Sequence, residues 1–99
     1  MHIIMLLEVP YKKGDTISLK LSSGEEILGR LDSETDQNIT LHKPMVLIAQ
    51  EKGLGLAPFM FSVSPTGKFV MKAASVLCIA KTEDDISKQY TTQTTGIAL

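Results

Sequence analysis

The chain has little cysteine and almost no net charge. With one cysteine among 99 residues, it has no intramolecular disulfide, and a reducing cytoplasm is the compartment that we expect. This cysteine, Cys78, lies in the apolar run from Val76 to Ala80, which predicts a small core residue rather than a reactive thiol. The net charge of −1 argues against a nonspecific binder of polyanions, because such proteins usually carry a strongly basic domain.

Recognisable catalytic and metal-binding motifs are also lacking. His2 and His42 are far apart in the sequence, and no CxxC, HExxH or paired-histidine spacing is present, which argues against a metal site. Three acids, Asp32, Glu34 and Asp36, alternate along one stretch, but a solvated strand face is the more ordinary reading than a cation site. The sequence holds no phosphate-binding loop and no readable Ser-His-acid set. We therefore predict a protein that is not an enzyme and uses no metal or cofactor.

Long hydrophobic runs are missing as well. The N-terminal run from Ile3 to Leu7 is far shorter than the ~20 apolar residues of a membrane span. It also lacks the basic flank and the small-residue cleavage site of a signal peptide. We interpret it as a strand or short helix that lies against the rest of the fold and ends at Pro10, and we expect no membrane association.

What the chain does contain is a pattern of strands between Asp15 and Leu41. In the first strand, apolar residues alternate with polar ones, the period of a half-buried strand; they are Ile17, Leu19 and Leu21. A Ser-Ser-Gly turn follows, and the second strand carries Gly29 in its middle. A glycine there costs stability, so it indicates a sharp bend or a close backbone approach. A bent strand in so short a chain points to a closed barrel.

The remaining strands are predicted from turn signals and apolar runs. Pro44 marks an edge or a bend in a long third strand, because proline cannot donate to a central ladder. The next elements are a glycine-rich turn at 51–55, a strand at 58–63, a turn at 64–67, and strands at 68–72 and 76–80. Thr82 is the predicted N-cap of a short helix with acids in its first turn. We expect this helix to end near Tyr90 and an extended tail to follow.

Length and continuity predict one domain over residues 1–99. Within it we expect an N-terminal segment at 1–14, a barrel at 15–81, and a C-terminal helix and tail at 82–99. A barrel this small buries a low fraction of its surface, so pairing with further copies would benefit it.

The glycine and apolar spacing of the first strands resembles the first signature of the Sm/LSm family, which includes bacterial Hfq. The matching residues are Leu19, Gly24, Ile27, Gly29, Leu31 and Asp36. A second half of the signature falls at 70–76, where Lys72 takes the basic position and Ala73 departs from the family pattern. The overall pattern is most similar to small phage-encoded Sm-like proteins. The resemblance implies an all-β fold, a strongly bent five-stranded SH3-like barrel, here with a short C-terminal helix.

In Sm proteins the loops after strands two and four bind single-stranded RNA at the pore of a ring. Carried over to this chain, the resemblance assigns RNA-binding roles to four residues, Asp36, Gln37, Asn38 and Lys72. Asn38 would bind a base edge, Lys72 would close the pocket, and Gln37 stands where relatives place a stacking side chain. From the residues alone, a polar β-turn at 36–38 remains an alternative.

In relatives, strand four of one subunit pairs with strand five of the next. The resemblance therefore implies a homo-oligomeric ring of five to seven subunits. Its interface residues would be Phe69, Val70, Met71, Val76, Leu77, Cys78 and Ile79. The implied function is noncatalytic binding of U- or A-rich single-stranded RNA, as a chaperone or regulator. The alternative is a structural or protein-interaction ring that has lost RNA binding, which the near-neutral charge, Gln37 and Ala73 favour.

Overall fold

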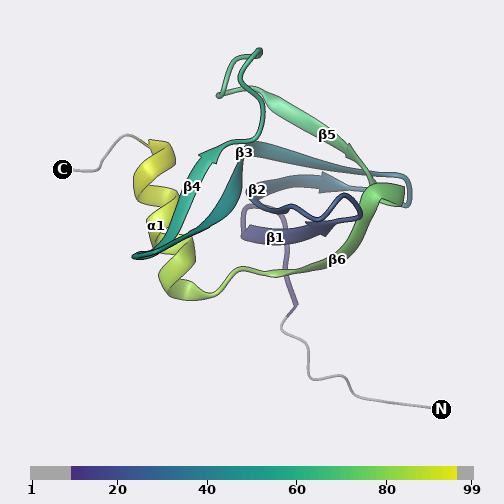
Figure 1. The fold of residues 1–99 in the computed structure, drawn as a ribbon. Coiled ribbons are helices and arrows are strands. Elements are labelled where there is room, and N and C mark those ends of the chain that lie inside the picture. Colours follow the sequence, from purple (N-terminus) through teal and green to yellow (C-terminus); the bar gives the residue numbers. More distant parts are fainter. Residues whose placement is uncertain (1–9, 96–99) are drawn as a thin grey trace.

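In the part of the chain that the structure describes, the strands form a bent antiparallel sheet with an α-helix beside it (Figure 1). The computed structural model describes residues 10–95. Their elements are β1 (Thr16–Leu21), β2 (Glu26–Glu34), β3 (Asn38–Gln50), β4 (Gly53–Pro58), β5 (Lys68–Lys72), a 3-10 turn (Ala73–Ser75), β6 (Val76–Lys81) and α1 (Asp84–Thr95). The element predicted before Pro10 and the end of the predicted tail, 96–99, lie outside the described residues. Between residues 10 and 95, no helix has the length and apolarity to cross a membrane.

The sheet is organised around β3, which is 13 residues long. The strands lie in the order β4-β3-β2-β1-β6, and β5 also pairs with β3. Residues 38–42 of β3 pair with β5, and residues 45–50 pair with β4. β4 and β5 each pair with one half of β3, so together they take the place of one strand beside it. The six strand segments therefore form a five-stranded arrangement. The predicted all-β, strongly bent five-stranded barrel with a C-terminal helix is confirmed.

The bend that the sequence predicts is present where β2 crosses β3. The register between these strands shifts between Leu28 and Arg30, so Gly29 faces Lys43 and Pro44. Lys43 adopts a φ of 52°, a left-handed conformation that is uncommon outside glycine. A Cβ atom on Gly29 would lie 3.0 Å from the Leu41 side chain. Glycine therefore permits the close approach at which the two strands bend.

The core lies inside this bend and is built from the alternating apolar positions of the strands. Its buried members are Ile17, Leu19, Leu21, Ile27, Leu31, Ile39, Leu41 and Met71. Full burial of one such side chain contributes about 1.5–3 kcal/mol. Five of the eight come from the first two strands, which explains why that stretch carries the clearest strand pattern.

The prediction for residues 51–63 was wrong in its details. The structure places β4 at Gly53–Pro58, where a turn was predicted, and an irregular segment follows where the strand at 58–63 was predicted. We call residues 59–67 the excursion. Pro58 and Pro65 at its two ends cannot donate to a ladder, which stops strand pairing. Gly55 lies in the strand rather than in a turn, since it pairs with Ile48 of β3.

The helix also differs from its prediction at its start. The Thr82 hydroxyl lies 2.8 Å from the Ser18 hydroxyl instead of capping the helix, and the Thr82 N–H donates to the carbonyl of Thr16. Thr82 therefore extends the pairing of β1 with β6. The predicted acids of the first turn are confirmed as Asp84 and Asp85.

The end of α1 is later than predicted, because residues 91–95 are helical rather than an extended tail. Contacts with the sheet hold this last turn in place. The Gln93 side-chain amide donates to the Leu56 carbonyl at 3.1 Å, and the Lys43 ammonium donates to the Thr94 carbonyl at 3.0 Å. α1 consequently lies beside β4, at the end of the sheet away from the β5–β6 link (Figure 1).

Candidate nucleic-acid interface

The fold brings the four predicted RNA-binding residues together. Asp36 and Gln37 lie in the turn between β2 and β3, Asn38 begins β3, and Lys72 ends β5. Asn38 and Lys72 are direct partners in the β3–β5 register. All four line one shallow recess of about 440 Å³, together with Ala73 and Ala74. Residues 34 positions apart in the sequence thus share one surface.

The turn that carries Asp36 and Gln37 is held by Thr35. The Thr35 hydroxyl accepts hydrogen bonds from the backbone N–H groups of Gln37 (3.3 Å) and Asn38 (3.1 Å). The Gln37 carbonyl in turn accepts from the Ala73 N–H at 2.9 Å. These bonds tie the turn to the β5–β6 link and leave the side chains of Asp36 and Gln37 exposed at the tip.

Asn38 is the member of the recess with unused hydrogen-bonding capacity. Its side chain is half-buried, and its Oδ1 atom is buried with no hydrogen-bond partner within residues 10–95. Leaving a buried acceptor unsatisfied costs roughly 1–3 kcal/mol. Asn38 also lines the recess, so turning its amide outward would let an N–H donor from outside satisfy this atom and remove the cost.

The electrostatics of the recess are balanced. Among the six lining residues, Lys72 is the one cation and Asp36 the one anion, and both side chains are exposed. A nearby cation, Lys68, is engaged elsewhere, because its ammonium lies 3.4 Å from the Asp32 carboxylate. The recess of one protomer is therefore not a basic patch. Any contact to phosphate from these six residues would rest on Lys72.

The seven predicted interface residues divide into an inner and an outer set. In the inner set, Met71 belongs to the core, Val76 and Ile79 pack against it, and Phe69 is half-buried. The outer set is Val70, with 61% of its surface exposed, Leu77, with 69%, and the exposed Cys78. The expectation that Cys78 is a core residue was wrong, because its side chain lies on the outward side of β6. The outer set is available for contact with another molecule.

The acids that alternate along β2 do not form a metal site. Asp32 pairs with Lys68, and Glu34 accepts a hydrogen bond from the Tyr11 hydroxyl at 2.9 Å. Within the described range, no group of three histidine, cysteine, aspartate or glutamate side chains is arranged to hold a metal ion.

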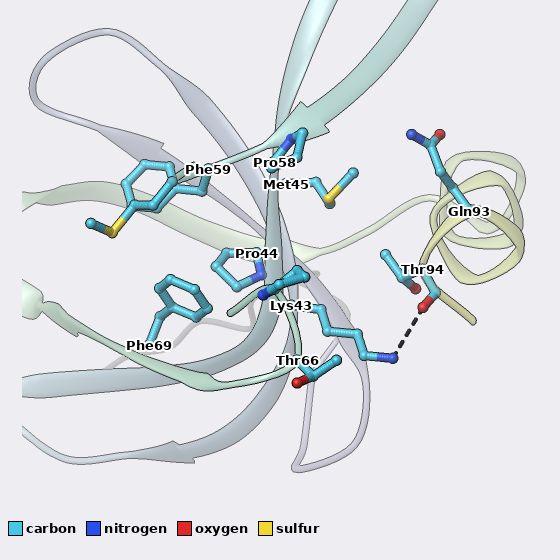
Figure 2. A pocket seen from close by; sticks show the side chains of 11 residues that line it. Lys43, Pro44, Met45, Pro58, Phe59, Thr66, Phe69, Gln93 and Thr94 are labelled. Atoms are coloured by element: carbon cyan, nitrogen blue, oxygen red, sulfur yellow. Dashed lines mark hydrogen bonds between the residues drawn. The ribbon is translucent and has the colours of Figure 1, made fainter. Parts of the chain in front are cut away.

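Sequence reasoning missed a separate apolar cavity of about 310 Å³ around the β3 bend. It is lined chiefly by Pro44, Pro58, Phe59 and Phe69, with Gln93 and Thr94 of α1 on one side (Figure 2). None of the four predicted RNA-binding residues lines it. Lys43 is the cation that lines this cavity, and its ammonium group donates a hydrogen bond to the Thr94 carbonyl (Figure 2). Pro44 was the one residue whose sequence context pointed to this region, because it marked a bend. It did not indicate the cavity beside that bend.

Comparisons with known proteins support the fold. No protein-family model matches the chain, and a search of curated proteins found no match. Among solved structures, the chain is similar to an archaeal Sm protein that is described as heptameric, with implications for the eukaryotic snRNP core. The TM-score is 0.51 at 19% sequence identity, and the match covers 72% of this chain and 90% of that one. The fold of this protein is therefore Sm-like.

Proposed function

We propose that this protein is a noncatalytic, Sm-like RNA-binding protein that acts as a homo-oligomeric ring of five to seven subunits in the cytoplasm. The observation that carries the proposal is the recess at 36–38 and 72–74, where an unpartnered acceptor lies beside an exposed ammonium group. Its role would be that of a chaperone or regulator of U- or A-rich single strands.

Support for the ring comes from two strand edges. In the described part of the chain, β5 pairs with β3 along one edge and β6 pairs with β1 along one edge, and the other edge of each has no partner strand. Open edges favour pairing with another chain. Joining β5 of one copy to β6 of the next gives a head-to-tail contact, which closes into a ring when the rotation permits. The heptameric state of the archaeal neighbour is consistent with this assembly.

Support for RNA comes from the chemistry of the recess. Single-stranded RNA is read through the hydrogen-bonding edges of unstacked bases and held through its phosphates. In this proposal, Asn38 Oδ1 accepts a hydrogen bond from a base N–H, and Lys72 contacts phosphate. A ring repeats the recess once per subunit, so several weak contacts act on one strand.

A fluorescence anisotropy titration with oligo-U and oligo-A at physiological salt tests the function. Lys72→Ala should weaken binding of both and reduce the salt slope by roughly 0.7 for one lost phosphate contact. Asn38→Ala should cost about 1 kcal/mol or more and change the preference between the two sequences. Lys52→Ala, in the exposed turn between β3 and β4, is the matched control and should leave binding unchanged. Wild-type protein with no measurable affinity for either oligonucleotide would refute the proposal.

A second candidate is a structural or protein-interaction ring without RNA binding. The balanced charge of the recess favours it, and so does Gln37, which has no ring to stack on a base. Light scattering distinguishes the candidates when it is combined with the titration. A ring that binds neither oligonucleotide supports this second function, whereas a monomer at micromolar concentration contradicts both.

A further inference from the structure

The excursion forms a groove with β5 that the proposed RNA site does not use. We call it the edge groove; it is lined by Phe59, Met60 and Val63 of the excursion and by Phe69, Val70 and Met71 of β5. The groove has a volume of about 380 Å³. Since consecutive residues of β5 line it, the groove is continuous with the strand whose outer edge is unpaired in the described chain.

The edge groove is suited to an uncharged occupant. Residues 59–67 contain no ionisable side chain. Lys68, the charged residue of the groove lining, already lies 3.4 Å from Asp32. A lining whose one cation is paired with a carboxylate offers a phosphate backbone little net attraction, which argues for a protein occupant rather than RNA.

One surface of the same chain has the matching properties. Residues 76–80 of β6 are Val-Leu-Cys-Ile-Ala and carry no charged side chain. Leu77 is 69% exposed and Val70 of the groove is 61% exposed. Large exposed apolar side chains on a small domain mark contact surfaces when they lie together. Within residues 10–95, β6 and β5 also each have one edge without a partner strand, so backbone and side chains favour the same partner.

We propose that the edge groove seats β6 of a second copy of this chain, with Leu77 entering between the excursion and β5. This inference rests on the proposed ring and goes beyond strand pairing. It assigns the excursion, which lies between β4 and β5, a role as a surface for self-assembly. Val63 and Met60, each more than two fifths exposed, would become buried against the neighbouring copy.

The single native cysteine provides the test, because Cys78 lies exposed on β6. Val63→Cys places a second thiol in the excursion, Val70→Cys places one on β5, and Thr92→Cys places one on the exposed side of α1. Each variant is treated with a short bismaleimide cross-linker and analysed on a denaturing gel. We expect covalent ladders from Val63→Cys and Val70→Cys, none from Thr92→Cys, and loss of both ladders when Cys78→Ser is added.

The outcomes separate the groove from the ring. A ladder from Val70→Cys without one from Val63→Cys overturns the edge-groove assignment and leaves the ring standing. A Val63→Cys ladder that persists with Cys78→Ser also overturns it, because the excursion would then meet another excursion. If neither variant cross-links and the protein scatters light as a monomer, the ring fails and the groove assignment with it.

A charge substitution gives a second readout that needs no cross-linking. Val63→Asp places a carboxylate on a side chain that is 44% exposed, so the fold of one copy tolerates it. Buried against β6, that carboxylate would weaken self-association by about tenfold or more. Thr92→Asp is the matched control and should not change assembly. Unchanged assembly of Val63→Asp contradicts the inference.

Discussion

The two halves of β3 differ in how they are held. Residues 38–42 pair with β5 and place Ile39 and Leu41 in the core. Residues 45–50 pair with β4, contribute only the partly buried Val46 to the packing around the core, and are exposed from Ile48 onward. The first half therefore rests on apolar packing, and the second relies on its ladder and on α1. The candidate RNA recess, at the start of β3, therefore adjoins the half of the strand that is anchored in the core.

The largest effect is expected from two side-chain truncations, one in each half of β3. Leu41→Ala removes a side chain with 0% exposure and should lower the free energy of unfolding by about 2–5 kcal/mol. Ile48→Ala truncates a side chain that is 41% exposed and should cost less than about 1 kcal/mol. Urea denaturation of both variants measures the difference. Equal losses would mean that the two halves are held alike.

The boundary between the halves is tested at Gly29. Gly29→Val forces side-chain atoms into the Leu41 side chain, 3.0 Å from the added Cβ, and should destabilise the fold by about 1–3 kcal/mol. Gly67→Ala is the control, because its added Cβ would meet only the Ser64 carbonyl at an ordinary 3.6 Å. If thermal melts show the two variants to be equally stable, the close approach of β2 and β3 is not what shapes the bend.

A smaller effect is expected where α1 contacts the bend. The buried Tyr90 hydroxyl lies 2.8 Å from the Lys43 carbonyl and 3.0 Å from the His42 carbonyl. Tyr90→Phe removes this donor and should cost about 1 kcal/mol. RNA affinity should not change, because the recess lies five residues away along β3, or roughly 17 Å. A loss of RNA binding in this variant would show that the two halves are coupled.

The same tyrosine predicts a pH dependence. Burial raises the pKa of the Tyr90 hydroxyl above its ordinary value of 10.0. The folded state therefore favours the protonated form, and the resulting stability is present below pH 10 and lost as the pH rises toward the folded pKa. Denaturation midpoints of wild-type protein should fall over this range more steeply than those of Tyr90→Phe.

The parts of the fold that local rules govern were predictable from the sequence. The alternation in β1, the bend at Gly29 and the proline in β3 act over a few residues, and the structure has each of them. The excursion was not predictable, because Phe59 to Val63 has the composition of a strand and only its flanking prolines end the ladder. The end of α1 was missed because its threonines are weak helix formers. Tertiary hydrogen bonds from Gln93 and to Thr94 override that preference.

The candidate site was also predicted only in part, because its turn positions follow from the sequence but the burial of its side chains depends on tertiary packing. The resemblance placed Asp36, Asn38 and Lys72 at turn positions, and strand pairing brings them into one recess. The buried, unpartnered Asn38 Oδ1 was not predictable, because burial depends on how the β2–β3 turn packs against the β5–β6 link. The engagement of Lys68 by Asp32 was also hidden, and it removes a cation that the sequence alone leaves free.

The most direct test of the central claim maps RNA onto the protein. A 4-thiouridine-labelled oligo-U is photo-cross-linked to the wild-type protein, and the modified peptides are identified by mass spectrometry. Binding at the recess predicts cross-links within residues 35–38 and 72–75. Cross-links confined to the excursion or to α1, at RNA concentrations that saturate the protein, would contradict the account.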